Sequence, residues 1–443
     1  MAVKGLDIFK LSPKTNCKEC GCPTCMAFCM KVAQGALPIE KCPHMSDEAL
    51  ALLSEATAPP MKTIALGDHK LGGETVLYRH DKTFVSRPLY ADYFEDTMDD
   101  AAVDARIEAV KAVDYERIGE RMYVEALYVK YTGAEDAYLA LVEKVKGLDR
   151  ALVLDVKDVA VATKALDAAA GTPVVLNGAT EDNYADMSAL AASKKAVLGV
   201  SAADIGALYD TVKAIEGLGN KDLILDVGAA SMKDAFANAV KIRRTALKDN
   251  DRTFGYPSIV NVRALAPDDS HMQAALASLF TCRYGSIIVM DEMDYAKALP
   301  MYGLRQNIFT DPQKPMRVAP GIYPLNGAGP DDICLTTVDF ALTYFVVSGE
   351  VERSGVPVNL LISDAGGYSV LTAWAAGKLS PNSIAKFMEE YEIASKINNR
   401  KLVIPGKVAV LKGELEAKLP DYEIIVAPNE AVELVKFLRD MNA

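Results

Sequence analysis

The sequence predicts an α/β protein in three parts: a small four-cysteine module, a central (β/α)8 TIM-like barrel and a C-terminal Rossmann-like domain. Three observations lead to this prediction. Six of the eight cysteines lie within residues 17–42, strand-like runs alternate with amphipathic helical stretches over residues 61–325, and a shorter alternation follows a turn-rich segment. We therefore expect domains at residues 1–57, 61–325 and 326–443.

The composition excludes several classes of protein. Half of the 443 residues are apolar, which is enough for two or three proper cores. No apolar run approaches about 18 residues, so we expect no membrane span. The first residues lack the apolar region of a secretory signal, and the net charge of −12 argues against a nucleic-acid partner. Unpaired cysteines suit a reducing compartment, so we expect a cytoplasmic protein.

Four cysteines of the first module follow the spacing C-x2-C-x4-C-x16-C, namely Cys17, Cys20, Cys25 and Cys42. The last of them returns from a distance and precedes a proline, as in ferredoxin-type ligation, which favours a [4Fe–4S] cluster. A structural zinc site with His44 is an alternative, whereas a disulfide scaffold is disfavoured. Cys22 and Cys29 could lie beside the metal or be buried thiols.

Helix-like segments surround these thiols at residues 24–34 and 46–55. Ser46 can cap the second segment, and the acidic residues after it suit a first helical turn. Ala58–Pro60 then ends the helix and begins a stiff linker. The module is too small to bury much apolar surface, so a bound metal would supply part of its folding free energy.

Residues 61–325 predict the barrel, after an opening hairpin at Thr63–Leu66 and Thr75–Tyr78. The eight expected strands are Glu125–Tyr131, Ala151–Val156, Pro173–Asn177, Ala196–Val200, Leu223–Val227, Ser258–Val262, Ser286–Met290 and Met316–Ala319. Amphipathic helices separate most of them, for example at 136–146, 159–170, 201–218 and 231–249. Eight such alternations indicate a (β/α)8 barrel, with a doubly wound open sheet as the alternative.

The chemistry of such a barrel lies at the carboxyl ends of its strands. The candidates there are Asp155, Asn177, Gly199, Asp226, Asn261 and Asp291. Asp155, Asn177 and Asp226 could hydrogen-bond a pterin ring, but we expect that they simply cap the helices that follow. No glycine-rich dinucleotide fingerprint follows any of these strands, so we interpret the barrel as a scaffold.

The remaining residues predict a compact α/β unit. Its expected elements are a helix at Val338–Val347, a strand at Val358–Ser363, helices at 368–376 and 381–397, a strand at Lys401–Ile404, a helix at 408–419, a strand at Glu423–Val426 and a helix at 430–441. Ligands of such units gather at the carboxyl ends of the strands. The loop at 363–369 is the most suggestive, because its two glycines let backbone amides approach a flat or anionic ligand. An ordinary βα turn is the alternative.

Two stretches carry a resemblance to a known family: Asn16-Cys-Lys-Glu-Cys-Gly-Cys-Pro-Thr-Cys-Met-Ala-Phe28 and Ile362-Ser-Asp-Ala-Gly-Gly-Tyr-Ser-Val-Leu-Thr-Ala373. With the order of cysteine module, barrel and Rossmann-like unit, the chain resembles the large (gamma) subunit of the corrinoid iron–sulfur protein. The resemblance spans essentially the whole length, and its cysteine signature is the specific part. That family serves the reductive acetyl-CoA pathway and the acetyl-CoA decarbonylase/synthase complexes.

The resemblance implies a methyl carrier with two cofactors. A corrinoid in the Co(I) state would accept a methyl group from methyltetrahydrofolate on a separate pterin methyltransferase, and methyl-Co(III) would donate it to acetyl-CoA synthase/CO dehydrogenase. The [4Fe–4S] cluster, on the four cysteines named above, would reduce Co(II) that forms by accidental oxidation. The resemblance also implies a heterodimer with a smaller subunit. A cluster-bearing pterin methyltransferase, and an electron-transfer or scaffold subunit without corrinoid, are the alternatives.

One departure from related domains bears on the cobalt. Many corrinoid domains carry D-x-H-x-x-G, in which the His ligates cobalt, whereas this sequence has Gly366 at the His position and Ser369 at the last Gly. The histidines of the chain all precede the C-terminal unit: His44, His69, His80 and His271. We therefore expect a corrinoid of the cobalamin type with no His ligand from this unit. Loss of an axial donor favours four-coordinate Co(I).

The resemblance also implies where the corrinoid would bind. The residues expected at its lower face are Gly366, Gly367, Tyr368, Ser369, Val370, Leu371, Thr372 and Ala373, with Ser369 and Thr372 as the nearest hydroxyls. Those expected to hold the nucleotide tail are Phe340, Val346, Ala427, Pro428 and Glu433. Plain core packing is the alternative for Phe340 and Val346.

Overall fold

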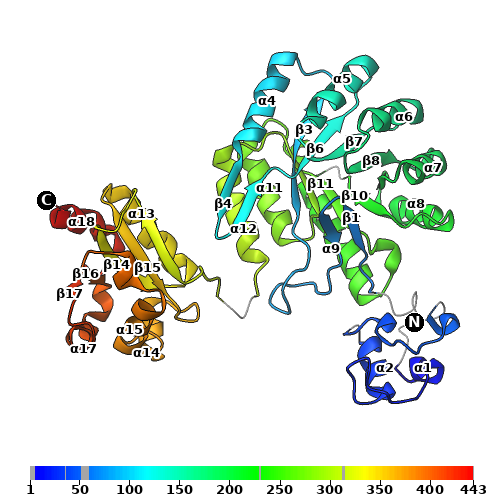
Figure 1. The fold of residues 1–443 in the computed structure, drawn as a ribbon. Coiled ribbons are helices and arrows are strands. Elements are labelled where there is room, and N and C mark those ends of the chain that lie inside the picture. The colour runs from blue at the N-terminus through cyan, green and yellow to red at the C-terminus, as the bar shows by residue number, and fades with distance from the viewer. Residues whose placement is uncertain (1–4, 35, 51–58, 229–230, 312–314, 443) are drawn as a thin grey trace. The chain divides into compact units, whose positions relative to one another are not determined.

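The computed structural model describes residues 5–34, 36–50, 59–228, 231–311 and 315–442 (Figure 1). The chain divides into two compact units, Met1–Phe309 and Thr310–Ala443. None of the helices formed by the described residues is long and apolar enough to cross a membrane.

The N-terminal residues form short helices around the cysteine loop. The helices are α1 (Gly5–Leu11), α2 (Cys25–Ala33) and the 3-10 helix η1 (Ile39–Lys41). The predicted helix at 24–34 is confirmed, because Thr24 caps α2 by accepting a hydrogen bond from the backbone of Ala27. Ile8, Phe28, Val32 and Ile39 pack with Cys29 into a small core of their own.

The second predicted helix of this module is described only at its start. Its helical residues begin at Asp47, and the Ser46 hydroxyl accepts a hydrogen bond from the Ala49 backbone, as expected of a cap. The rest of the segment, and Ala58 of the predicted linker, lie outside the described residues.

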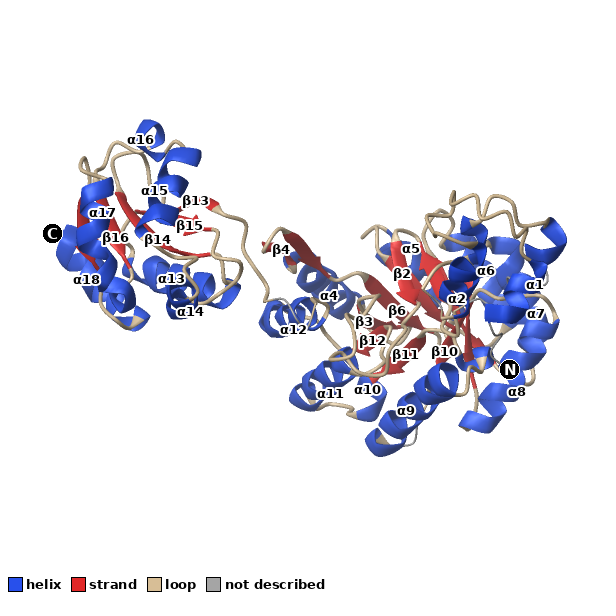
Figure 2. Cartoon of the chain, turned by 90° about the horizontal axis from the view of Figure 1, so that it is seen from below, coloured by secondary structure: helices blue, strands red, loops and turns tan. Residues whose placement is uncertain are grey.

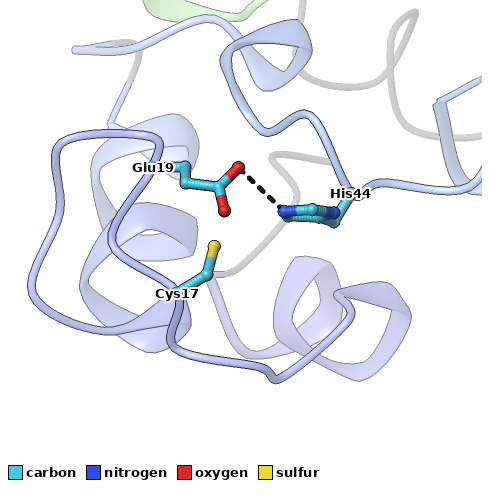
Figure 3. Close-up of side chains that lie close together, drawn as sticks. All are labelled: Cys17, Glu19 and His44. Carbon is cyan, nitrogen blue, oxygen red and sulfur yellow. Dashed lines mark hydrogen bonds and ion pairs between the residues drawn. The ribbon is translucent and has the colours of Figure 1, made fainter.

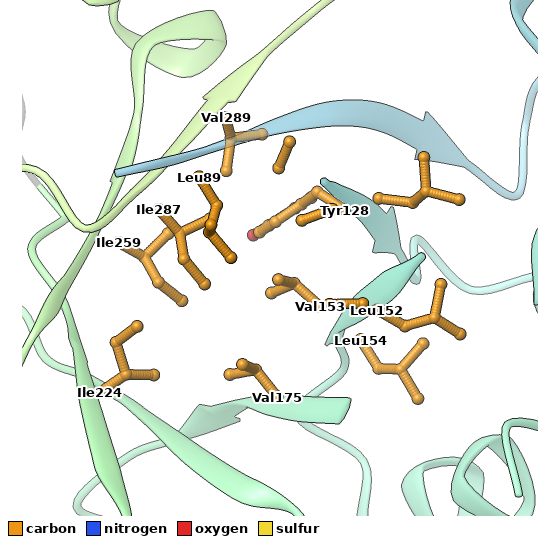
Figure 4. Close-up of a cluster of buried hydrophobic side chains, with 14 of the residues drawn as sticks. Leu89, Tyr128, Leu152, Val153, Leu154, Val175, Ile224, Ile259, Ile287 and Val289 are labelled. Atoms are coloured by element: carbon orange, nitrogen blue, oxygen red, sulfur yellow. The ribbon is translucent and has the colours of Figure 1, made fainter. Parts of the chain in front are cut away.

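Eight parallel strands close into a barrel, which confirms the predicted architecture and excludes the open sheet. In spatial order they are β10 (Leu223–Asp226), β11 (Ser258–Asn261), β12 (Ile287–Met290), β3 (Leu89–Glu95), β6 (Ala126–Lys130), β7 (Ala151–Asp155), β8 (Val174–Ala179) and β9 (Val197–Ser201). Branched and aromatic side chains such as Tyr128, Val153, Val175 and Ile259 fill the interior (Figure 4). The barrel is therefore a packed core and not a pore.

Helices enclose these strands (Figure 2). They are α4 (Asp100–Ala112), α5 (Glu135–Lys146), α6 (Val159–Ala168), α7 (Tyr184–Lys194), α8 (Ile205–Gly217), α9 (Met232–Lys248), η2 (Arg252–Phe254), α10 (Val262–Leu265), α11 (Ser270–Cys282) and α12 (Tyr295–Ile308). Acidic side chains begin several of them, since Asp99, Asp158 and Asp204 each accept backbone N–H groups of the first turn.

One predicted barrel strand is wrong. Met316–Ala319 belongs to the second unit, and the eighth barrel strand is β3, which the sequence reading missed. The reason is Asp92, which interrupts the apolar run of β3 yet is fully buried there. Its carboxylate accepts the backbone N–H of Met293, and burial raises the pKa of Asp92 to about 7.

The opening hairpin was predicted with the wrong partner. Strand β1 (Thr63–Leu66) pairs antiparallel with β2 (His69–Gly72), and Thr75–Tyr78 forms no strand. A tight turn at Gly67, where φ is +58°, leads directly from one strand into the other. Gly72 is the last residue of β2, so the Gly72–Gly73 pair does not form the turn of the hairpin. A second hairpin, β4 (Asp114–Arg117) with β5 (Glu120–Tyr123), was not predicted.

The C-terminal unit is a five-stranded sheet with helices on both faces (Figure 1). The strand order is β13 (Gly321–Leu325), β15 (Val358–Ser363), β14 (Ile333–Val338), β16 (Lys401–Ile404) and β17 (Glu423–Val426), and β13 alone runs antiparallel. One face packs against α13 (Ala341–Ser354) and α18 (Leu434–Asn442). The other face packs against α14 (Val370–Ala375), α15 (Pro381–Glu390) and α17 (Lys412–Lys418).

Three strands of this unit lie where the sequence predicted them, and two were missed. The expected helix at 338–347 begins too early, because Val338 is the last residue of β14 and α13 starts three residues later. The boundary expected after residue 325 is also wrong, since β13 pairs along its whole length with β15 and is part of this sheet.

The later helices are more broken than predicted. The segment 381–397 forms α15 and α16 (Ile393–Lys396), separated at Glu392, whose φ is +52°. The segments at 408–419 and 430–441 each begin in a 3-10 helix, η3 (Gly406–Leu411) and η4 (Ala431–Glu433).

Candidate cofactor-binding sites

The cysteine loop is held by reciprocal hydrogen bonds between Asn16 and Cys25. The Asn16 side-chain oxygen accepts the Cys25 backbone N–H at 2.8 Å, and the Asn16 backbone N–H donates to the Cys25 sulfur at 3.3 Å. Asn16 and Lys18 both adopt positive φ, so the loop turns sharply around the thiols. Cys20, Cys25 and Cys42 are buried, and Cys17 is exposed.

The thiols of the predicted ligand set lie close enough to repel one another once ionised. Burial raises the pKa of the Cys42 thiol most, and a hydrogen bond from the His44 backbone lowers it. Three neighbouring thiols raise it further, those of Cys20, Cys25 and Cys17. Because thiolates crowded in this way need a positive partner, the geometry suits a metal centre.

The two additional cysteines differ in their surroundings. Cys29 is fully buried, and burial, before the charges of Cys25, Cys42 and Cys20, raises the pKa of its thiol against a hydrogen bond with Ser12. Cys22 is also buried. Both therefore match the expected buried thiols, and Cys29 lies beside the ligand set.

Cys17, Glu19 and His44 form a mixed group at the exposed edge of the loop (Figure 3). Their candidate ligand atoms lie within 4.8 Å of one another, and His44 Nε2 is 2.9 Å from a carboxylate oxygen of Glu19. The group contains His44, the histidine of the zinc alternative, and Glu19, which was not predicted. The buried thiols differ from Glu19 and His44 in offering sulfur alone, and an all-sulfur set is typical of an iron–sulfur cluster.

In the C-terminal unit, Asp339 organises the glycine loop that follows β15. Its carboxylate is fully buried and accepts the backbone N–H groups of Ala365 at 2.9 Å and Gly367 at 3.0 Å. The Arg317 guanidinium lies 3.3 Å from this carboxylate and 3.2 Å from that of Asp364. Asp339 therefore ties the end of β14 to the loop after β15.

The glycines of this loop are required by its backbone. Gly366 and Gly367 have φ values of +71° and +78°. A Cβ at Gly367 would lie 2.8 Å from the side chains of Arg317 and Pro315. The loop thus differs from an ordinary βα turn: two consecutive residues adopt left-handed backbone conformations, and the side chains of Arg317 and Pro315 pack against the second.

A pocket of about 380 Å³ opens at the carboxyl ends of β14, β16 and β17. It is lined by Leu335, Thr336, Thr337, Phe340, Leu342, Thr343, Val346, Val347, Ser369, Val370, Leu371, Ile404, Pro405, Gly406, Lys407, Ala427, Pro428, Asn429, Glu430, Ala431 and Leu434. The chain leaves β14 toward β15 on one side and places β16 on the other, so the pocket lies at the topological switch point of the sheet.

More than half of the residues predicted to bind the corrinoid line this pocket. Those that line it are Phe340, Val346, Ser369, Val370, Leu371, Ala427 and Pro428. Tyr368 and Thr372 are exposed on the neighbouring loop and helix, and the Thr372 hydroxyl lies 3.0 Å from that of Ser369. Gly366, Gly367 and Glu433 do not line it, and Ala373 is fully buried in the core, so its side chain cannot face a ligand.

Sequence reasoning missed the strand that forms the floor of this pocket. Thr336 and Thr337 are both buried at the end of β14. The Thr336 hydroxyl lies 3.4 Å from that of Ser363, whereas the Thr337 hydroxyl has no hydrogen-bond partner. The β-branched run Ile-Cys-Leu-Thr-Thr-Val at 333–338 is the signal that could have identified the strand.

Two loops meet at the rim of the pocket. A Cβ at Gly406, after β16, would lie 2.4 Å from the carbonyl oxygen of Ala427 and 2.6 Å from that of Pro428, after β17. Only glycine lets these loops approach so closely. Lys407 and Glu430 pair across the same rim at 2.9 Å.

At the barrel mouth, Asn177 joins two carboxylates. Its side-chain amide donates to Asp226 at 2.8 Å and to Asp155 at 3.2 Å, and Lys130 donates to Asp155 at 3.0 Å. Burial raises the pKa of Asp226 to about 6. The structure therefore brings together the three residues considered for a pterin.

The expectation that these residues cap helices is wrong. The N-caps of α6, α7 and α9 are Asp158, Asn183 and Ser231, which come after the strand-end residues. Of the remaining strand-end candidates, Asn261 does cap α10, and Asp291 pairs with Arg106 and Arg263 instead.

Two family models match the chain. A family model described as CO dehydrogenase/acetyl-CoA synthase delta subunit matches residues 66–438, and a model described as a putative Fe-S cluster matches residues 13–44. The corrinoid/iron-sulfur protein large subunit of Moorella thermoacetica is 37% identical over 99% of this chain and 99% of its own length. The chain belongs to the family of the corrinoid/iron-sulfur protein large subunit. The acetyl-CoA decarbonylase/synthase complex subunit gamma of Methanopyrus kandleri is 32% identical over 98% of this chain and 97% of its own length.

Family membership confirms the resemblance drawn from the cysteine signature and the glycine loop. The matched Fe–S segment contains all four cysteines of the predicted ligand set. Among solved structures, a dihydropteroate synthase from Thermus thermophilus is matched over 55% of this chain and 99% of its own at 18% identity, with a TM-score of 0.39.

The residues of the C-terminal pocket fit a corrinoid of the expected kind. The pocket is mostly apolar, opens at the switch point and leaves one buried hydroxyl, that of Thr337, without a partner. No histidine occurs after residue 271, so this unit contains no imidazole. Leu342, Val346 and Leu371 are exposed apolar side chains that line the pocket, where a large ring would cover them.

Proposed function

We propose that this chain is the methyl-carrying subunit of a system for acetyl-CoA synthesis, with a corrinoid on the C-terminal unit and a [4Fe–4S] cluster on Cys17, Cys20, Cys25 and Cys42. When bound, the corrinoid would supply a cobalt that takes a methyl group from methyltetrahydrofolate and gives it to acetyl-CoA synthase, and the cluster would supply electrons that restore oxidised cobalt. The pocket at the switch point, with its glycine loop held by Asp339, is the observation that supports this function most directly.

The residues of the C-terminal unit would hold the corrinoid without providing a His ligand to its cobalt. The loop at 364–369 carries glycine where related domains carry a cobalt-ligating His, and Asp339 fixes its backbone through two hydrogen bonds. A loop held in this way and without an imidazole would offer no strong donor to a bound cobalt, which would make the cobalt easier to reduce. Phe340, Val346, Ala427 and Pro428 would hold the nucleotide tail.

The cysteine loop would hold its cluster through one exposed and three buried thiols. The Asn16 backbone N–H donates to the Cys25 sulfur, and such N–H groups stabilise negative charge on cluster sulfurs. Cys17 at the exposed edge would leave one side of the cluster accessible to an electron donor.

The partners in this proposal follow from the family. A separate pterin methyltransferase would present the methyl donor, acetyl-CoA synthase/CO dehydrogenase would receive the methyl group, and a smaller subunit would cover the corrinoid. Trp374 of α14, an exposed side chain outside the pocket lining, suits such a cover.

The test is metal analysis and a visible spectrum of the anaerobically purified protein, before and after a strong reductant. We expect about four irons for each cobalt, and a sharp Co(I) band on reduction. A Thr372→Trp variant, which changes an exposed side chain, should lose cobalt and keep its iron. Iron without cobalt in the wild-type protein would contradict the carrier function, and zinc in place of iron would contradict the cluster.

A second candidate is a pterin methyltransferase that carries its own cluster. The observation that favours it is the row of Asp155, Asn177 and Asp226, which offers amide and carboxylate groups to the edge of a pterin ring. Calorimetric titration of the isolated chain with methyltetrahydrofolate separates the two functions. A methyl carrier that relies on a separate methyltransferase gives no binding heat, and an Asn177→Ala variant then behaves as the wild type.

A further inference from the structure

His44 lies beside two of the four cysteines of the predicted ligand set. Its backbone forms a hydrogen bond with the Cys42 thiol. Its side chain belongs to the exposed group in Figure 3, in which one ligand atom each of Cys17, Glu19 and His44 lie within 4.8 Å of one another. A cluster bound to Cys17 and Cys42 would therefore have the imidazole of His44 next to its exposed edge.

The separation of the Cys17 and His44 ligand atoms is close to what one metal ion can bridge. Metal–sulfur and metal–nitrogen bonds are about 2.3 and 2.1 Å long, so an ion between a thiolate and an imidazole bridges up to about 4.4 Å. The His44 side chain is 45% exposed, so it can turn without disturbing the small core of the module. A small turn therefore brings its ring to an iron on Cys17.

Cys17 is the ligand for which a substitute matters most. It is exposed, whereas the other three cysteines of the set are buried. Oxidants and alkylating reagents reach exposed thiolates first. Because cysteine thiolates hold the irons of such clusters, loss of the Cys17 thiolate would leave one iron without a protein ligand.

The other groups around the set suit this iron less well than His44 does. Glu19 offers a carboxylate, but iron prefers imidazole, and His residues replace two cysteines in Rieske-type clusters. The Glu19 carboxylate lies 2.9 Å from His44 Nε2, so it serves to hold the ring in place. Cys29 is fully buried and lies beside Cys25, Cys42 and Cys20, away from the exposed edge.

We propose that His44 is an alternate ligand for the iron that Cys17 holds, and that it keeps a four-iron cluster intact when the Cys17 thiolate is lost. The inference rests on the proposed function, because it takes the [4Fe–4S] cluster on the four cysteines as given. While the thiolate is present, Cys17 holds the iron and His44 stays hydrogen-bonded to Glu19. A neutral imidazole in place of an anionic thiolate makes the cluster easier to reduce.

The experiment uses the full-length protein after anaerobic reconstitution with iron and sulfide. It measures bound iron, bound sulfide and the electron paramagnetic resonance spectrum. The first variant is Cys17→Ala, which removes the thiolate without adding a ligand, and it is combined in turn with His44→Ala and with Glu19→Gln. Cys25→Ala is the matched control, since Cys25 is a buried thiol outside the exposed group.

We expect Cys17→Ala to retain about four irons per chain, also in combination with Glu19→Gln. Its reduced cluster should show a strong nitrogen hyperfine coupling, typical of direct ligation, that the wild type lacks, and its midpoint potential should shift upward. The Cys17→Ala/His44→Ala variant should fall to about three irons, with the signal of an oxidised [3Fe–4S] cluster. Cys25→Ala should lose iron although His44 is present.

Three results would overturn the inference and leave the cluster of the wild type in place. Loss of iron in Cys17→Ala alone would mean that His44 cannot replace the thiolate. A full cluster in Cys17→Ala/His44→Ala would assign the replacement to another group, such as Cys29 or solvent. A full cluster in Cys17→Ala without nitrogen coupling, lost on adding Glu19→Gln, would assign it to Glu19. A wild-type protein that binds no four-iron cluster would instead contradict the proposed function.

Discussion

The two sets of strand ends in this chain treat their buried polar groups in opposite ways. At the barrel mouth, Asn177 donates to Asp155 and Asp226, and Lys130 donates to Asp155, so hydrogen bonds join these side chains to one another. The Asn177 oxygen lacks a partner, but it lies against Gly199, where even a Cβ would approach it to 2.3 Å. A ligand would have to displace bonds that already exist.

In the C-terminal unit, buried polar groups lie near an open pocket. Asp339 uses its carboxylate to shape the loop, and the Thr337 hydroxyl stays unpaired on the wall of a pocket of about 380 Å³. The difference teaches that polar residues at strand ends do not by themselves mark a binding site. An unpaired polar group beside open volume is the stronger sign.

The largest expected effect comes from removing Asp339. An Asp339→Ala variant leaves the backbone N–H groups of Ala365 and Gly367 buried without an acceptor, which should destabilise the C-terminal unit by about 3 kcal/mol and abolish corrinoid retention. Trp374, the one tryptophan of the chain, lies in this unit and reports its urea unfolding by fluorescence.

The matched control for that variant is Asp364→Asn, which changes a carboxylate of the same loop that is two-thirds exposed. Its unfolding midpoint should stay close to that of the wild type, since exposed ion pairs contribute little. Equal effects of the two substitutions would show that Asp339 is no special anchor, and the contrast between the two sets of strand ends would lose its basis.

A smaller effect is expected at the rim of the pocket. A Gly406→Ala variant forces the loops after β16 and β17 apart, because the added methyl group would lie 2.4 Å from the Ala427 carbonyl oxygen. The expected cost is about 1–3 kcal/mol in unfolding free energy, with weaker corrinoid binding. Gly413→Ala is the control, since it adds a methyl group to an exposed helical position with open space around it and should be neutral or slightly stabilising.

Much of the fold could be predicted because its signals are local. Seven barrel strands and three strands of the C-terminal sheet are short apolar or β-branched runs between amphipathic helices. The two internal strands that were missed carry polar residues inside the run, Asp92 in β3 and Thr336 with Thr337 in β14. The burial of Asp92 depends on the Met293 backbone N–H, a partner that no local pattern shows.

The candidate sites likewise include residues that local patterns predict and residues that only the packed structure reveals. The cysteine spacing and the Gly366–Gly367 pair are local patterns, and the family comparison and the positive φ values agree with them. Asp339 could not be identified, because the N–H groups that it accepts follow 26 and 28 residues later in the chain. The unpaired state of Thr337 is likewise a property of the packed structure and not of the sequence.

The smallest expected effect is that of a substitution at the barrel mouth, at Asp226. Burial, with a smaller contribution from the Asp155 charge, raises the pKa of Asp226 to about 6 against the hydrogen bond from Asn177. Since the folded-state pKa is raised, the stabilisation by protonated Asp226 is complete below the unfolded pKa near 4 and is lost as the pH rises through about 6. Asp226→Asn should therefore stabilise the barrel by about 1–2 kcal/mol near neutral pH and make the fall in stability between these values shallower, as thermal unfolding followed by circular dichroism would show. The remaining fall comes from Asp92, whose pKa is also raised by burial. Asp222→Asn, an exposed change just before the same strand, should leave that dependence intact. A barrel whose stability does not fall between about pH 4 and 6 would mean that Asp226 is ionised at little cost, and the mouth would then be open to solvent.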